Sequence, residues 1–138
     1  MNEKYFSLTR RYEGLNLFPY RCPTGHLTIG YGHNLEQGIS KEAAEFLLQE
    51  DMVRTQREVQ KAFAWWKNLD EVRQFVLLDM CFNMGLANLR TFKKFLLALC
   101  RHDYTAASRE MLDSRWAVQV GYRSRELAEM MQTGEYIK

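Results

Sequence analysis

The chain has 138 residues, a formal net charge of +2, 46% hydrophobic residues and 26% charged residues. This balance is typical of one globular domain or of two small lobes that share a core, and it excludes disordered and fibrous proteins. No apolar run approaches the roughly 20 residues that a transmembrane helix needs, so we expect no membrane insertion.

The opening residues, MNEKYFSLTRRYEG, contain neither an apolar segment nor a small-residue cleavage site. They are not typical of a signal peptide, so we expect synthesis in the cytoplasm and no export signal. The three cysteines are an odd number, which indicates free thiols in a reducing compartment. Cys81 and Cys100 lie in apolar helical patterns and are expected in the core, whereas Cys22 lies outside such patterns.

Basic residues predominate between Arg90 and Arg125, where eight lysines and arginines stand against three acidic residues. Two interpretations remain open, a solvated helix face or a surface for an anionic polymer such as a cell wall. Nucleic acid is not expected, because no zinc-ligand spacing and no aromatic-basic motif is present. The three dispersed histidines give no ligand set, so we expect no metal and no other cofactor.

The first predicted element is a short helix over residues 3–12. Tyr5, Leu8 and Tyr12 share one side of it, and Gly14 is a typical helix stop.

The segment LNLFPYRCPTGHLTIGYGH predicts a β-hairpin. Leu15 and Leu17 alternate with Asn16, and Leu27 and Ile29 alternate with Thr28, on the two sides of Pro23-Thr24-Gly25. Pro19 confines the first strand to a sheet edge, because proline has no amide hydrogen to donate. Gly30 and Gly32 interrupt the returning strand and predict bends or a close approach of the backbone to another group.

Helical periodicity begins at Ser40, a typical N-cap residue, and predicts a long helix over 40–62. Trp65 and Trp66 then indicate a turn. The segment EVRQFVLLDMCF predicts a second helix that is amphipathic apart from Asp79, and further helices are expected over residues 91–100, 104–113 and 114–131.

These elements predict an α+β fold that is mainly helical. We expect a small hairpin lobe over about residues 13–40, a connecting helix over about 40–62, and a larger helical lobe over about 1–12 and 63–138. A cleft between two such lobes is the usual place for a functional site.

Glu13 is the first candidate for chemistry, because it lies at the end of the opening helix. The negative end of the helix dipole disfavours the ionised carboxylate there, which suits a general acid. A glutamate that only points into water is the alternative, and the residue alone favours that simpler interpretation.

The wider pattern favours the site. In EGLNLFPYRCPTGHLTIGYGH, eight residues separate Glu13 from Cys22 and five separate Cys22 from Thr28. This segment resembles the active-site segment of the phage-type lysozymes, the muramidases of glycoside hydrolase family 24. LDEVRQFVLLDMCFNMG is similar to the central core helix of that family, and SRWAVQVGYRSR to its cleft-side helix pair, so the resemblance covers nearly the whole chain and implies a lysozyme-like fold.

The resemblance implies hydrolysis of the β-1,4 bond between N-acetylmuramic acid and N-acetylglucosamine in bacterial peptidoglycan. Glu13 would protonate the leaving oxygen, and Cys22 with Thr28 would hold a water on the other face of the sugar. Cys22 stands where the family more often has aspartate. Its role stays open among base, water holder and nucleophile, and Arg21 is its only cationic neighbour in sequence.

Other matched positions carry supporting roles. Arg123 matches an arginine that pairs with the catalytic glutamate, Phe82 and Asn83 match cleft-facing residues, and Phe82 is equally compatible with the core. Gly30 belongs to the matched Thr-Ile-Gly-x-Gly-His segment, and His33 and Asp51 match a buried structural ion pair. Only six residues, NLEQGI, separate His33 from Ser40. Longer family members have an extended loop there, so we expect a shallower cleft with fewer sugar subsites.

An endolysin fits these expectations: a bacteriolytic, antimicrobial phage enzyme, monomeric, made in the host cytoplasm, and acting on the wall after a separate holin lets it out. Three rivals remain. One is a lytic transglycosylase, which forms an anhydro product without attack by water. The others are a wall-binding module without catalysis and a structural phage component that uses only the fold.

Overall fold

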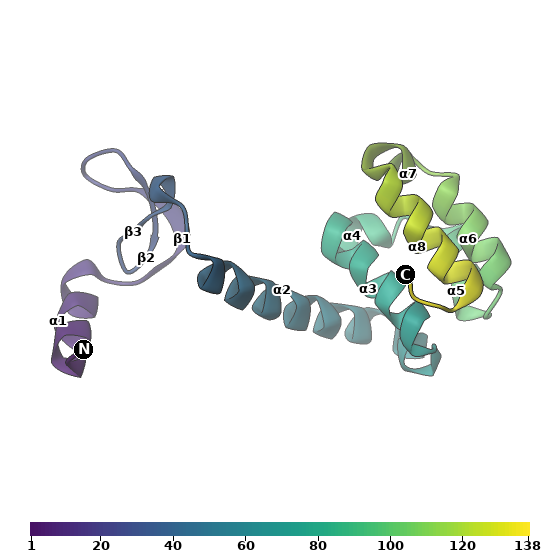
Figure 1. The fold of residues 1–138 in the computed structure, drawn as a ribbon, viewed down its shortest axis with the longest axis horizontal. Coiled ribbons are helices and arrows are strands. Elements are labelled where there is room, and N and C mark those ends of the chain that lie inside the picture. Colours follow the sequence, from purple (N-terminus) through teal and green to yellow (C-terminus); the bar gives the residue numbers. More distant parts are fainter. The chain divides into compact units, whose positions relative to one another are not determined.

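The computed structural model describes residues 1–138 and contains eight α-helices, two 3-10 helices and one three-stranded antiparallel sheet (Figure 1). The predicted α+β, mainly helical fold is confirmed. The chain forms two compact units, Met1–Leu47 and Leu48–Lys138. None of its helices combines the length and the apolar character required to cross a membrane. The predicted helical lobe combines residues 1–12 of the first unit with residues 63–138 of the second, and this grouping stays a prediction.

The first unit opens with helix α1, Glu3–Glu13, as the sequence predicts. The side chain of Asn2 caps it by accepting a hydrogen bond of 2.8 Å from the backbone N–H of Lys4. The helix ends at Gly14, whose N–H donates to the carbonyl of Arg10. These caps satisfy backbone groups that the helix itself leaves without partners, and they set Glu13 in the last helical position.

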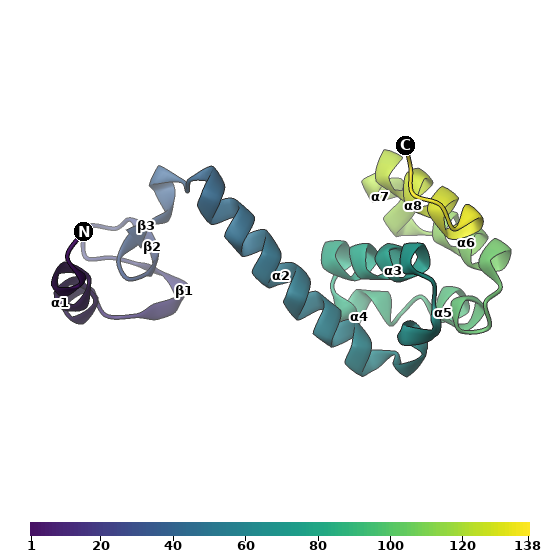
Figure 2. The ribbon, with the colours of Figure 1, turned by 60° about the horizontal axis from the view of Figure 1, so that its bottom comes forward.

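The predicted hairpin is confirmed as β1, Asn16–Arg21, paired with β2, Leu27–Gly30. A third strand, β3 (His33–Asn34), pairs with β2 and was not predicted, because two residues are too few to show alternation. The strand order β1-β2-β3 leaves β1 at an edge, which accommodates Pro19 as expected. A 3-10 helix, η1 (Leu35–Gln37), follows β3 (Figure 2).

The long predicted helix is confirmed as α2, Lys41–Ala62. The hydroxyl of Ser40 caps it by accepting a hydrogen bond of 3.1 Å from the N–H of Ala43. Towards its end, Thr55 and Val59 are buried within the second unit.

The second unit is entirely helical after α2. It contains the 3-10 helix η2 (Ala64–Asn68) and the helices α3 (Glu71–Met84), α4 (Leu86–Leu89), α5 (Lys93–Cys100), α6 (Tyr104–Leu112), α7 (Arg115–Val120) and α8 (Tyr122–Thr133). Helix α8 packs against α3, α6 and α7, and α5 packs against α6 (Figures 1 and 2).

Gly121 divides the region that periodicity predicts as one helix over 114–131. Its φ of +54° is unfavourable for residues with a side chain and breaks the helical path between α7 and α8. The hydroxyl of Ser124 donates to the Gly121 carbonyl and holds the turn. The single-helix prediction is therefore wrong, and the helix pair implied by the family resemblance is what forms.

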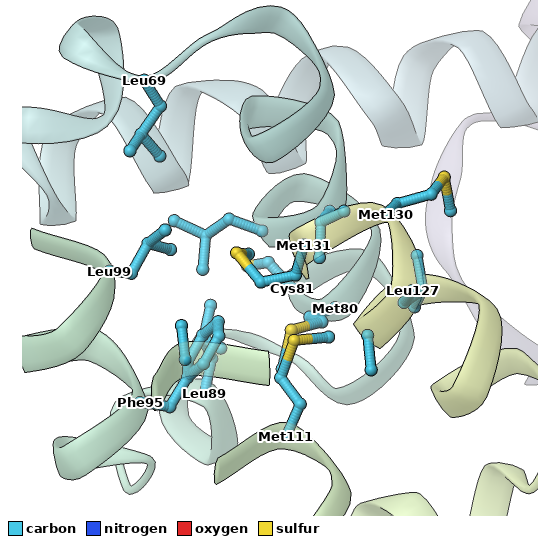
Figure 3. Packing of buried hydrophobic residues seen from close by; sticks show 14 of the residues in the cluster. Leu69, Met80, Cys81, Leu89, Phe95, Leu99, Met111, Leu127, Met130 and Met131 are labelled. Carbon is cyan, nitrogen blue, oxygen red and sulfur yellow. The ribbon is translucent and has the colours of Figure 1, made fainter. Parts of the chain in front are cut away.

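One hydrophobic core fills the second unit (Figure 3). Its most deeply buried side chains come from α2, α3, α4, α5, α6 and α8, and they include Val59, Val76, Leu77, Met80, Leu89, Phe95, Leu99, Met111 and Met131. Full burial of such a side chain stabilises the fold by about 1.5–3 kcal/mol. All three cysteines are free thiols, as expected. Cys81 is buried as predicted, but Cys100 is exposed, because it closes α5 on the side away from the core.

Arg73 fastens α3 to the end of α8. Its Nε donates to the carbonyl of Met131 at 2.8 Å and its Nη2 to the carbonyl of Gln132 at 3.1 Å. Its guanidinium also lies over the ring of Tyr104, 3.7 Å from the centroid. The last carbonyls of α8, which have no partners within the helix, are satisfied in this way.

Candidate active site

A pocket of about 500 Å³ lies in the first unit. Its lining contains all three residues that the sequence nominates for catalysis, and its members are Glu13, Tyr20, Cys22, Pro23, His26, Thr28, Gly32 and Asn34. They come from the end of α1, from the hairpin and from β3. A carboxyl group, a thiol and a hydroxyl group therefore line the same pocket.

The carboxyl group of Glu13 rests against the backbone of Gly32. A Cβ atom on residue 32 would lie 2.8 Å from the carboxyl carbon of Glu13, closer than such atoms approach in proteins. Gly32 also has a φ of +74°, which glycine adopts without strain. The close backbone approach predicted for this part of the strand occurs at Gly32. Gly30 has open space where a Cβ would stand.

Cys22 begins the tight turn between β1 and β2. Its N–H donates to the carbonyl of His26 at 2.9 Å, and its carbonyl accepts from the N–H of Gly25 at 2.8 Å. The Sγ atom lies 3.1 Å from the hydroxyl of Thr24. Hydrogen bonding from Thr24 to the thiolate is the main reason why the pKa of Cys22 falls to about 7. A substantial thiolate fraction therefore exists near neutral pH, without any help from burial.

Thr28 is the only buried residue of the first unit, with 3% of its surface exposed. Its hydroxyl donates to the carbonyl of His26 at 2.8 Å. While the hydroxyl hydrogen is engaged in that bond, the oxygen is free to act as an acceptor.

His26 and Glu36 form an ion pair beside the pocket that the sequence did not reveal. The Nδ1 atom of His26 lies 2.8 Å from Oε2 of Glu36. This hydrogen bond raises the pKa of His26 and lowers that of Glu36. Arg21 lies 3.6 Å from the same carboxylate and donates to the carbonyl of Gly25. The one available signal was Glu36 itself, the only charged residue in the short segment NLEQGI.

Phe82 and Asn83 lie on α3, in the second unit. Phe82 is 36% exposed and is not part of the core, which excludes the core interpretation. Asn83 Oδ1 accepts a hydrogen bond of 2.8 Å from the indole Nε1 of Trp116. The contact of these two residues with substrate stays a prediction.

Arg123 pairs with Asp79 in the second unit, a partner that lies 44 residues away in the sequence. The pair expected between Arg123 and Glu13 joins residues of different units and stays a prediction.

His33 and Asp51 also belong to different units, and each has a partner of its own. The His33 ring lies 3.0 Å from the carbonyl of Gly38, and Asp51 forms an exposed ion pair of 2.8 Å with Arg54. The expected pair between His33 and Asp51 likewise stays a prediction.

A larger pocket, about 810 Å³, lies in the second unit between α4, α5, α6 and α7. It contains Trp116 together with charged side chains of both signs, namely Lys93, Lys94, Glu110, Asp113 and Arg115. It holds none of the nominated residues. Only the pocket of about 500 Å³ combines an acid with a thiol whose pKa is about 7, so we place the candidate active site there.

Comparisons with known proteins agree with this combination of fold and residues. Residues 10–131 match the model of the phage lysozyme family. The chain is 32% identical to an endolysin of Acyrthosiphon pisum secondary endosymbiont phage 1, over 85% of this chain and 80% of the relative. It is 27% identical to a probable T4-type lysozyme of Dictyostelium discoideum, over 88% and 89%.

A further relative is the pre-baseplate central spike protein of Enterobacteria phage T4. The chain is 26% identical to it, over 96% of this chain but only 28% of that protein. The matched family model spans nearly the whole chain and includes every residue that lines the smaller pocket. This protein is therefore a member of the phage lysozyme family and a lysozyme-type glycosidase.

Proposed function

We propose that the enzyme hydrolyses the β-1,4 bond between N-acetylmuramic acid and N-acetylglucosamine in bacterial peptidoglycan. The observation that supports this most is the pocket in which Glu13, Cys22 and Thr28 come together. Hydrolysis of a glycosidic bond needs a proton donor for the leaving oxygen and a group that manages the attacking water. The three side chains supply these functions.

Glu13 is the general acid. It gives its proton to the glycosidic oxygen as the bond between that oxygen and the anomeric carbon breaks. The carboxyl group needs a defined position for this step, and its contact with Gly32 supplies one.

Thr28 binds the attacking water, and Cys22 takes a proton from it. The water donates one hydrogen bond to the Thr28 oxygen, which accepts because its own hydrogen is bound to the His26 carbonyl. The water oxygen attacks the anomeric carbon while its other proton passes to the Cys22 thiolate. Glu13 ends as a carboxylate and Cys22 as a thiol, and exchange with solvent restores both. Attack from the face opposite the leaving group inverts the anomeric configuration.

The remaining nominated residues have supporting roles in this proposal. Phe82, Asn83 and Arg123 contact or orient substrate, Gly30 shapes the strand beside Thr28, and His33 pairs with Asp51 for stability. The enzyme acts as a monomeric endolysin without a cofactor. It is made in the bacterial cytoplasm and reaches the wall through a separate holin.

Product analysis on purified peptidoglycan tests the reaction. We expect fragments with a free reducing end on N-acetylmuramic acid, each carrying the elements of one water. Fragments lighter by that water and without a reducing end would instead indicate a lytic transglycosylase. Binding to peptidoglycan with no released fragments would indicate a wall-binding module.

A further inference from the structure

The pair formed by His26 and Glu36 stands beside the candidate active site without a role in the proposed reaction. His26 lines the pocket together with Cys22, and its carbonyl accepts hydrogen bonds from both the Cys22 N–H and the Thr28 hydroxyl. Glu36 binds the Nδ1 side of the ring, and its second oxygen accepts from the N–H of Leu27 at 3.4 Å. Glu36, a residue of η1, therefore holds the His26 ring at the wall of the pocket.

The free edge of this ring is chemically important. With Nδ1 bound to Glu36, the Nε2 atom has no partner within the protein. Because the Glu36 carboxylate stabilises the protonated ring, His26 carries a positive charge over a wider pH range than an ordinary histidine. A histidine that only stiffened the hairpin would not need to line the pocket.

We infer that His26, oriented by Glu36, is a positioning residue for Cys22, whose thiolate form it favours by placing an imidazolium charge at the same pocket. This inference rests on the proposed function, since the thiolate is the form of Cys22 that takes the proton of the attacking water. The imidazolium charge acts on the Cys22 sulfur through space. The hydrogen bond from the Cys22 N–H to the His26 carbonyl keeps the two residues close together.

The other charged groups near Cys22 do not replace His26. The carboxyl group of Glu13 lines the same pocket and opposes a thiolate whenever it is ionised. Tyr20 also lines the pocket and carries no cationic group. Arg21, the only cation that the sequence places next to Cys22, is directed to the Gly25 carbonyl and the Glu36 carboxylate. The guanidinium is thus engaged by groups other than the Cys22 sulfur.

The test is the pH dependence of alkylation of Cys22 by iodoacetamide, with each cysteine peptide quantified separately by mass spectrometry. In the unaltered protein, the rate should rise with an inflection near pH 7, following the pKa of about 7. In His26→Gln, the inflection should move to higher pH, and the rate at pH 6.5 should fall by about 3–10-fold, a modest effect because the ring is half exposed.

Two controls make the result specific. His102→Gln removes an exposed histidine of the second unit and should leave the Cys22 profile unchanged. His26→Lys keeps a positive charge and should restore most of the alkylation rate. Circular dichroism and melting curves establish that each variant is folded.

An unchanged inflection in His26→Gln would overturn the inference, as would a failure of His26→Lys to restore the rate. The limb of the peptidoglycan-lysis pH profile that reports Cys22 should move with the alkylation inflection. An alkylation shift without that movement would also contradict the inference, because Cys22 would then not work as a thiolate. Alkylation needs no substrate, so its outcome is separate from the test of the glycosidase reaction itself.

Discussion

Arg123 donates two parallel hydrogen bonds to the carboxylate of Asp79, from Nε to Oδ2 and from Nη2 to Oδ1, both 2.9 Å long. The side chain of Asp79 is only 16% exposed, while that of Arg123 is 40% exposed. The carboxylate raises the pKa of Arg123 and links α8 to α3. A two-point contact of this kind fixes the direction of the guanidinium as well as its position.

Removal of the aspartate should destabilise the second unit. Asp79→Ala leaves the guanidinium without its partner, and we expect the free energy of unfolding to fall by about 1–2 kcal/mol, since solvent screens the half-exposed arginine. Urea denaturation measures the change. Glu3→Ala is the matched control, because it removes the more exposed pair of Glu3 with Arg10. Equal losses in the two variants would contradict a structural role for the Asp79 pair.

A methyl group at residue 32 should displace the proposed acid. In Gly32→Ala, the new Cβ collides with the Glu13 carboxyl group, and we expect lytic activity to fall by about tenfold or more because the acid is misplaced. Gly38→Ala is the control, since Gly38 has the same φ of +74° but open space around its Cβ position. Both variants carry the backbone strain, so only Gly32→Ala should lose activity. Equal activities would show that the Glu13 contact is unimportant.

The role of Cys22 determines the product anomer. If Cys22 takes a proton from water, Cys22→Asp should remain active, and both enzymes should release sugar with inverted configuration. Nucleophilic attack by sulfur would give a covalent intermediate and a retained configuration. Proton NMR of freshly released sugar, recorded before mutarotation, distinguishes the two. A retained anomer, or a glycosyl adduct on Cys22 in a mass spectrum, would rule out the water mechanism.

The pair of His26 with Glu36 should make stability depend on pH. Because the folded pKa of His26 is raised, its contribution is complete below the ordinary histidine pKa and is lost as the pH rises through the raised value. The lowered pKa of Glu36 means that its contribution is lost as the pH falls through that lower value.

Melting temperatures of the unaltered protein and His26→Gln should therefore differ most between these two pKa values and converge above the raised pKa of His26. His102→Gln provides the comparison for a histidine without a carboxylate partner. A difference that stays constant from the acidic to the alkaline end would contradict the pair.

The sequence predicted most elements because their signals are local. Ser40 capping the long helix, Gly14 ending the first one, and Pro19 at a sheet edge each follow from the chemistry of one residue and its neighbours. The division at Gly121 was missed by periodicity, since the apolar pattern continues across a backbone turn that only φ reveals.

The site was predicted in part for a related reason. Glu13, Cys22 and Thr28 stand at a recognisable spacing, and Gly30 and Gly32 indicated a close approach, which occurs at Gly32. The pairs of His26 with Glu36 and of Arg123 with Asp79 join residues 10 and 44 positions apart. No local pattern encodes such contacts, although Asp79 in an otherwise apolar helix was a sign that a polar partner existed.

The most direct measurement is the rate at which Glu13→Gln releases reducing ends from purified peptidoglycan. Glutamine keeps the shape of the side chain but cannot deliver the proton, so we expect a fall of about 10²-fold or more. Glu45→Gln, which changes an exposed glutamate of α2, is the matched control and should retain full activity. A folded Glu13→Gln enzyme that works at the unaltered rate would contradict the assignment of Glu13 as the general acid.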